Sequence, residues 1–149
     1  MQEINQIEAD IRNLMVSQRF AVLSTLEPHH PYVNLVAFAE TGDLRTILFA
    51  TQRATRKYQN IASHAGVSFL IDNRSNEATD IRQAIALTVL GFASEVPVPE
   101  RQGLADVYLQ KQPQMKDFLG LSDTSLIRVE VASYILVSRF QDVAMLVMP

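Results

Sequence analysis

The chain has 149 residues and a formal net charge of −3, and it contains no cysteine, no tryptophan and only five glycines. We expect a single domain over residues 1–149, because this length suits one domain with a sizeable core. The lack of cysteine excludes disulfides, thiolate metal sites and a cysteine nucleophile. No two glycines stand close enough for a G-x-G-x-x-G turn or a Walker-type phosphate loop. A bound nucleotide must therefore be held in another way.

The charges and the apolar stretches also bear on partners and location. A net charge of −3 argues against nucleic-acid binding, which normally shows a basic excess. Residues 1–10 carry three acidic residues and no Lys or Arg, unlike a secretory signal. The longest apolar stretches are far too short to span a bilayer. We therefore expect a cytoplasmic protein with no nucleic-acid partner and no membrane partner.

The N-terminal third of the chain has the pattern of one helix followed by three strands. Apolar residues at helical spacing predict an amphipathic helix over 3–17. Strands are predicted over 20–26, 32–39 and 45–50, and two prolines mark the turn between the first two. The next turn contains Gly42, a residue that suits a positive φ.

The remaining pattern predicts further strands with helices between them. A glycine inside the long fifth strand indicates a β-bulge or a bend. About six strands joined largely by short turns, with helices at the ends and in two crossings, predict a mostly antiparallel barrel. The predicted elements are helices over 54–64, 99–110 and 113–119, strands over 67–71 and 85–96, and a strand or hairpin over 125–147.

The start of the second helix carries an unusual charge pattern. Thr55 is its predicted N-cap, and Arg56 and Lys57 stand in the first turn, where the helix dipole disfavours cations. A bound phosphate reverses that argument, because it takes up the free N–H groups and both side-chain cations. Thr51 and Thr55 add hydroxyl donors. The alternative is that both cations lie on a solvated face and reach acidic residues elsewhere, and the local pattern leaves both interpretations open.

Five segments in one order carry a resemblance to a known family. They are FAVLSTL at 20–26, PYVNLVAF at 31–38, LFAT at 48–51, TRK at 55–57 and ALTVLGFA at 86–93. Three further pieces belong to the same set: Asn60-Ile61, VSFLI at 67–71 and the stretch 134–140. The whole set resembles the FMN-binding split-barrel superfamily of pyridoxamine 5'-phosphate oxidase and its relatives. The similarity covers nearly the whole chain.

This resemblance implies a mainly β fold with flanking helices, a six-stranded antiparallel Greek-key split β-barrel. It also implies a homodimer that binds FMN in two clefts at the subunit interface. A Thr-Arg-Lys step would hold the flavin phosphate, β-strand residues would lie along the isoalloxazine ring and the ribityl chain, and a long strand of the partner would close the pocket. The implied cofactor-binding residues are Asn34, Leu35, Val36, Ala50, Thr51, Thr55, Arg56, Lys57 and, from the partner, Thr88.

The chain departs from the oxidase that gives the family its name. That enzyme has a C-terminal segment rich in Trp and Arg that helps to bind its vitamin substrate, whereas this chain has no Trp and ends in the apolar run 143–149. The resemblance therefore implies a flavin site without implying oxidation of pyridoxamine phosphate. The apolar segment 143–148 is either an exposed patch that a second subunit covers or a strand buried in the barrel.

Three functions remain as hypotheses. The first is an FMN-dependent oxidoreductase with a small-molecule redox partner. In this hypothesis the flavin carries the chemistry, because the sequence shows no clear candidate for a general acid or a general base. The second is a non-catalytic barrel that stores or senses flavin or haem. The third, a barrel that binds oligonucleotides, is disfavoured by the acidic balance. His29, His30 and His64 lack ligand spacing with acidic residues, so we expect no metal site.

Overall fold

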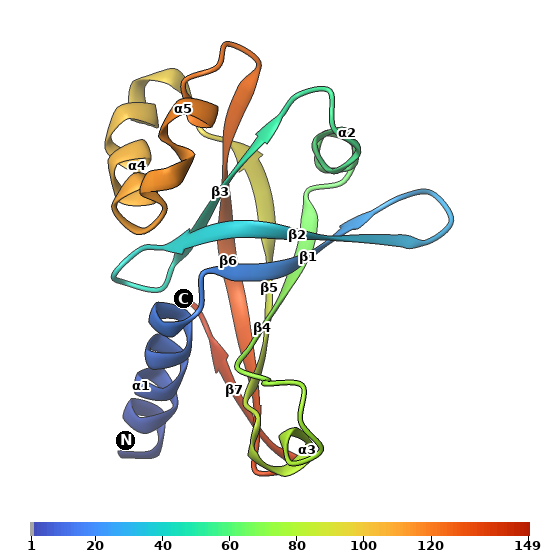
Figure 1. Ribbon diagram of the computed structural model, residues 1–149, viewed down its shortest axis with the longest axis vertical. Helices are drawn as coiled ribbons and strands as arrows, with labels where there is room; N and C mark the ends of the chain where they lie inside the picture. Colours follow the sequence, from blue (N-terminus) through green and yellow to red (C-terminus); the bar gives the residue numbers. More distant parts are fainter. Residues whose placement is uncertain (1) are drawn as a thin grey trace.

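The strands form one antiparallel sheet that closes on itself (Figure 1). The computed structural model describes residues 2–149. Its strand order is β3-β2-β1-β4-β5-β6-β7, and an additional pairing of β3 with β6 closes a six-stranded barrel, beyond which β7 extends the sheet. The strands are β1 (Phe20–Leu26), β2 (Pro31–Glu40), β3 (Thr46–Gln52), β4 (Gly66–Asp72), β5 (Ala86–Glu95), β6 (Thr124–Ser138) and β7 (Asp142–Val147). The helices are α1 (Gln2–Ser17), α2 (Arg56–Ser63), α3 (Asp80–Gln83), α4 (Val98–Lys111) and α5 (Lys116–Leu119), with a short 3-10 turn at Pro113–Met115.

The expected six-stranded antiparallel barrel with flanking helices is confirmed. The expected irregularity at the glycine of β5 also occurs, because the register of β5 against β6 shifts between Leu90 and Gly91. One local expectation is wrong: no glycine within residues 2–149 has a positive φ, and in the turn after β2 it is Leu44 that adopts φ 61°. Leu44 is buried and its carbonyl accepts a 2.6 Å hydrogen bond from the Tyr134 hydroxyl, so tertiary contacts stabilise this conformation.

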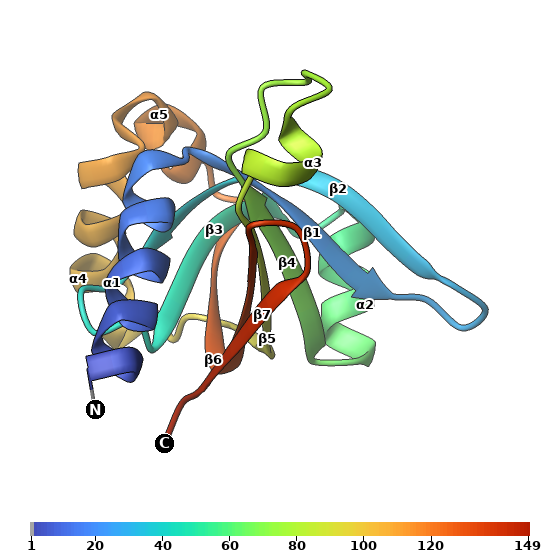
Figure 2. The same ribbon diagram turned by 90° about the horizontal axis from the view of Figure 1, so that it is seen from below.

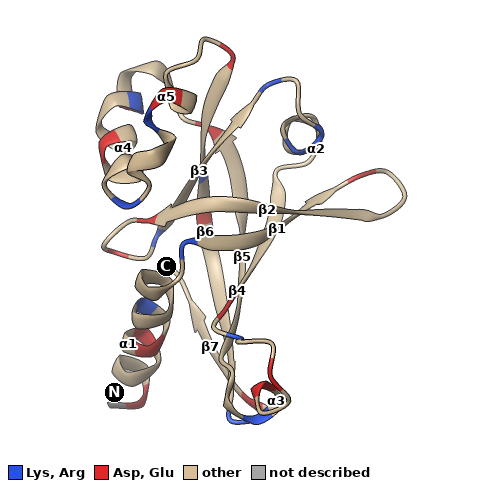
Figure 3. Cartoon of the chain, viewed as in Figure 1, with Lys and Arg blue, Asp and Glu red and all other residues tan. Residues whose placement is uncertain are grey.

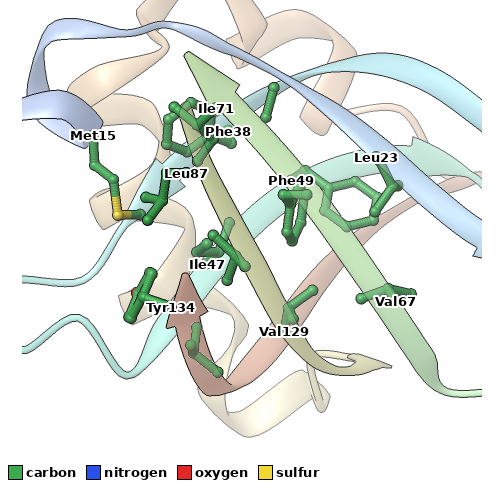
Figure 4. Packing of buried hydrophobic residues seen from close by; sticks show 14 of the residues in the cluster. Met15, Leu23, Phe38, Ile47, Phe49, Val67, Ile71, Leu87, Val129 and Tyr134 are labelled. Carbon is green, nitrogen blue, oxygen red and sulfur yellow. The ribbon is translucent and has the colours of Figure 1, made fainter. Parts of the chain in front are cut away.

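Alternating side chains of the strands fill the barrel interior (Figure 4). Successive residues of a strand point to opposite faces, so every second residue of β1 and β4 reaches the core. Phe49 and Phe69 meet edge to face in this core, with their ring centroids 6.1 Å apart. Helix α1 adds Ile11, Leu14 and Met15 from outside the sheet. Side chains of this cluster therefore fill the barrel interior.

A second apolar cluster lies on the outside of β3 and β6, under α4 and α5. Leu48 and Leu126 point away from the barrel interior and pack against Tyr108 of α4. The Tyr108 hydroxyl donates a 3.0 Å hydrogen bond to the Ala37 carbonyl of β2. Figure 2 shows α1, α4 and α5 gathered on one side of the barrel, and α2 on the other side, beside the β1–β2 hairpin. The helices therefore leave a large part of the outer sheet surface uncovered.

No helix within residues 2–149 combines the length and the apolar character that a membrane span requires. The same part of the chain contains no group of three His, Asp or Glu side chains arranged to hold a metal ion.

Candidate functional site

Helix α2 begins at the end of β3 with a capped and hydroxyl-lined first turn. Thr55 has extended dihedral angles (φ −77°, ψ 155°), and its hydroxyl accepts a 3.4 Å hydrogen bond from the backbone N–H of Tyr58. The same hydroxyl donates to the Gln52 carbonyl at 2.8 Å. It also lies 2.7 Å from the hydroxyl of Thr51, which is almost fully buried. The predicted N-cap is confirmed, and both predicted threonines meet at one point.

Arg56, the first residue of α2, is held by the β1–β2 hairpin. Its Nε atom lies 2.8 Å from Oε1 of Glu27, and its guanidinium carbon lies 4.9 Å from the centroid of the Tyr32 ring. Both neighbours stand next to the turn that joins β1 to β2, and the strands of this hairpin pass beside α2 in Figure 2. Arg56 therefore has an acidic partner, as the alternative interpretation of the local charge pattern expected.

Lys57 behaves differently from its neighbour. It is half-buried, and among residues 2–149 no Asp or Glu side chain lies within ion-pair distance of its Nζ atom. Desolvation by burial lowers the pKa of Lys57 below its ordinary value. The first turn of α2 thus contains one neutralised cation, Arg56, and one cation without a carboxylate partner, Lys57.

Asn34 of β2 carries an unpartnered polar atom. Its Oδ1 is buried and has no hydrogen-bond partner within residues 2–149. Asn34 lies on the same strand face as Tyr32 and Val36, because residues two apart on a strand point the same way. A buried acceptor without a donor costs about 1–3 kcal/mol, so such an atom is a candidate for contact with a ligand.

The outward surface of the sheet is apolar and exposed. Two neighbouring rows of paired residues cross it without a charged side chain, and we call them the apolar outer face. Figure 3 shows that charged residues lie mainly on the helices and turns instead. The rows are Val33, Ser24, Ser68, Leu90, Ser133 and Val147, and Leu35, Val22, Leu70, Thr88, Ile135 and Met145.

A groove of about 440 Å³ lies in this face. It is lined by small residues, among them Ser24, Ser68 and Ser133, together with Leu90 and Phe92. Phe92 is 61% exposed, and Val33 and Leu35 beside the groove are 61% and 66% exposed. Soluble monomers rarely expose a contiguous apolar patch of this kind, which is typical of an interaction or ligand surface.

The structure places the predicted site residues in five different surroundings. Thr51, Thr55, Arg56 and Lys57 lie together at the start of α2, and Asn34 lies on the strand face that carries Tyr32, the residue under Arg56. Leu35 and Thr88 belong to the same row of the apolar outer face but are separated by β1 and β4. Val36 packs inside the barrel, and the Ala50 side chain packs under α4, so Ala50 has only its backbone to offer a ligand.

Sequence reasoning missed two residues of this region. Glu27 accepts the ion pair from Arg56, and Asn60 donates a 3.0 Å hydrogen bond from Nδ2 to the hydroxyl of buried Thr25. Asn60 stands four residues after Arg56 and hence on the same helix face, which is a usable signal. No comparable signal marks Glu27, because its position depends on the path of the hairpin.

Comparison with known proteins agrees with the fold. The family model described as pyridoxamine 5'-phosphate oxidase matches residues 7–138. None of the curated proteins matches the chain.

Several solved structures have a similar fold. General Stress Protein 26 of Bacillus anthracis str. Sterne has a TM-score of 0.75 and 19% identity, over 95% of this chain and 98% of that one. A FAD-binding protein of Mesorhizobium loti has a TM-score of 0.69 and 12% identity, over 87% and 90%. A haem-binding protein of Mycobacterium smegmatis has a TM-score of 0.78 and 17% identity, over 90% of this chain and 55% of that longer one. At these identities the similarity concerns the fold.

Proposed function

Because the chain belongs to the pyridoxamine 5'-phosphate oxidase family, we propose that it binds FMN and works as a flavin-dependent oxidoreductase. The observation that carries the proposal is the arrangement at the start of α2. There the hydroxyls of Thr51 and Thr55 lie 2.7 Å apart, directly before the cations of Arg56 and Lys57.

The chemistry of this helix start suits a phosphate group. The first turn of a helix has free N–H groups and a partial positive charge, and both favour an anion. Arg56 and Lys57 add fixed positive charge, and charge-assisted hydrogen bonds to phosphate are about twice as strong as neutral ones. A phosphate also explains why Lys57, which has no carboxylate partner within residues 2–149, stands where the helix dipole disfavours a cation.

The donor and acceptor set also suits the rest of a flavin. Asn34 offers a buried amide oxygen without a donor, and a flavin has ring N–H and ribityl hydroxyl groups that donate. The apolar outer face offers an uncharged surface for the ring, as flavin sites require. The FAD-binding protein of Mesorhizobium loti, which has the same fold, supports a flavin as the ligand.

We propose further that the working unit is a homodimer with FMN at the subunit interface. The apolar outer face includes Val33, Leu35, Met145 and Val147, all more than half exposed in the single chain. A second copy that presents the same face would cover these side chains in a two-fold arrangement. In this dimer the partner's Thr88 would lie near the flavin of the first subunit.

Bound FMN would supply the redox chemistry by accepting a hydride or electrons from a small-molecule donor. The residues of the chain would have simpler tasks. Thr55, Arg56 and Lys57 would hold the phosphate, Asn34 would orient the flavin through its amide oxygen, and the apolar outer face of both subunits would exclude water from the ring.

FMN titration of the purified apo-protein tests the proposal. The double variant Arg56→Ala, Lys57→Ala should bind FMN on the order of 100-fold more weakly, because two charge-assisted bonds are lost. The double variant Arg74→Ala, Lys116→Ala removes two exposed cations elsewhere and serves as the matched control. Equal FMN affinity of both double variants would show that the phosphate is bound elsewhere. Absence of FMN binding by the wild type would reject the proposal as a whole.

The second candidate function is a non-catalytic barrel that stores or senses flavin or haem. It is favoured by the haem-binding protein of Mycobacterium smegmatis, which shares the fold, and by the apolar groove of about 440 Å³. Titration with haemin and with FMN in parallel separates the two ligands by their absorption bands. Bleaching of bound FMN by NADH or NADPH, followed by reoxidation in air, separates a catalyst from a storage protein.

A further inference from the structure

Glu27 is an acidic residue enclosed at the point where the phosphate of the proposed ligand would bind. Its side chain is only 13% exposed, whereas that of its partner Arg56 is 64% exposed. Its Oε1 receives Arg56 Nε at 2.8 Å and Asn60 Nδ2 at 3.5 Å, and its Oε2 lies 3.5 Å from His30 Nε2. The carboxylate is thus surrounded by donors from both the hairpin and α2.

This carboxylate changes the charge that the start of α2 presents to an anion. Arg56 and Lys57 together carry two positive charges, and Glu27 cancels one of them. A phosphate monoester carries nearly two negative charges at neutral pH. At this exposed helix start, a negative charge a few ångströms from the phosphate opposes binding, and its removal would favour binding.

We propose that Glu27 is an internal counter-ion that competes with the ligand's phosphate for Arg56 and thereby limits the affinity of the site for phosphorylated flavin. This inference rests on the proposed FMN binding. When the phosphate takes Arg56, Glu27 keeps Asn60 and His30 as donors, so the exchange does not leave a bare carboxylate in a shielded place. The high exposure of Arg56 gives its guanidinium room to move from one partner to the other.

The substitution Glu27→Gln tests the proposal, because it removes the charge and keeps an oxygen for Asn60. FMN should bind about 3- to 10-fold more tightly to this variant, and riboflavin, which has no phosphate, should bind about equally to both proteins. Glu27→Ala should change FMN affinity in the same direction, and it serves if the glutamine variant folds poorly. The matched control is Glu100→Gln on α4. It removes a carboxylate whose Oε1 lies 3.0 Å from Nη1 of Arg128 on β6. It should leave both affinities unchanged.

A double-mutant cycle with Arg56→Gln shows whether Glu27 acts through Arg56. In the Arg56→Gln background, removal of the Glu27 charge should tighten FMN binding less than in the wild-type background, because only the direct repulsion of the phosphate remains. A gain of the same size in both backgrounds overturns competition for Arg56. FMN affinity that is unchanged or weaker in Glu27→Gln also overturns the proposal, and a weaker affinity would show that Glu27 positions Arg56 for the ligand. If no form of the protein binds FMN, the proposed function itself has failed.

Discussion

The Nζ atom of Lys111 lies 2.7 Å from Oε2 of Glu40, and both side chains are shielded from water, at 17% and 12% exposure. The same ammonium donates a 2.7 Å hydrogen bond to the Met15 carbonyl and lies 3.9 Å from the centroid of the Phe38 ring. One side chain of α4 therefore joins the end of α1 to β2.

Replacing Lys111 by Met should lower the free energy of unfolding by about 2–4 kcal/mol, because it leaves the Glu40 carboxylate shielded and without its cation. The double variant Lys111→Met, Glu40→Gln should recover most of that loss. Urea unfolding at neutral pH measures both. A single variant as stable as the wild type would show that the ion pair contributes nothing.

Tyr108 should make the protein sensitive to alkali. Burial raises the pKa of Tyr108 from 10.0 to about 12, so between these values the folded protein keeps a proton that the unfolded chain has lost. The stabilising contribution is therefore fully present below pH 10 and is lost as the pH rises through 12, on the order of 3 kcal/mol in all.

The variant Tyr108→Phe isolates this contribution. It should be about 1 kcal/mol less stable at pH 7, because the hydrogen bond to the Ala37 carbonyl is lost. Its stability should fall less steeply than that of the wild type from pH 10 upward. Unfolding curves taken at several alkaline pH values compare the two slopes, and equal slopes would contradict the prediction.

Two glycines should respond oppositely to replacement by alanine. A Cβ at Gly91 would lie 2.5 Å from the Glu130 carbonyl oxygen of the paired strand, a backbone atom that cannot turn aside. Gly91→Ala should therefore cost about 1–3 kcal/mol. Gly103 lies inside α4 with nothing within 4 Å of such a Cβ, so Gly103→Ala should stabilise the protein by up to about 1 kcal/mol. Thermal unfolding measures both, and a tolerated Gly91→Ala would refute the close approach.

Asn34 should lower the free energy of unfolding of the protein and raise its affinity for FMN. Asn34→Leu removes a buried oxygen that lacks a partner, so the variant should be at least as stable as the wild type. Its FMN affinity should fall about 5- to 20-fold, because a hydrogen bond to the ligand is lost. Thr124→Val removes another unpartnered buried oxygen and should leave FMN affinity unchanged. A fall in stability with unchanged affinity would contradict the role assigned to Asn34.

A charge placed on the apolar outer face should prevent dimer formation. Val147 is 67% exposed in the single chain and lies in one of the two rows of that face. Val147→Lys should shift the protein toward the monomer in light scattering, because a lysine ammonium would have to be buried in the interface. Val98→Lys, at an 85% exposed site on α4, is the control and should leave the dimer intact. A wild type that is already monomeric would exclude the dimer.

Local signals predicted the elements well because they act over a few residues. The threonine before Arg56 and the glycine in β5 each have one short-range role, and both roles were found where expected. The direction of Ala50 was not predictable, because β3 is apolar on both faces and shows no alternation. Glu27 escaped prediction for a different reason, since it meets Arg56 only through the tertiary path of the β1–β2 hairpin.

The apolar C-terminal segment is partly buried and partly exposed, so each of the two predicted alternatives holds for some of its residues. Leu146 and Met148 pack against the barrel core, while Val143, Met145 and Val147 point outward and are more than half exposed. From the sequence, the segment 143–148 is expected to be either exposed as a whole or buried as a whole. A strand with one face on each side of the sheet satisfies both.

The pairing of β3 with β6 has a consequence for folding during synthesis. In that ladder Thr46 faces Glu130 and Gln52 faces Thr124, so the barrel closes only across a long stretch of chain. On the ribosome, β3 is made well before its second neighbour and remains an open edge until β6 leaves the exit tunnel. Loop-closure entropy delays such distant pairings, so ring closure belongs to the last steps of folding. Nascent chains halted before Thr124 should therefore stay sensitive to proteases at β3, and release of β6 should abolish that sensitivity.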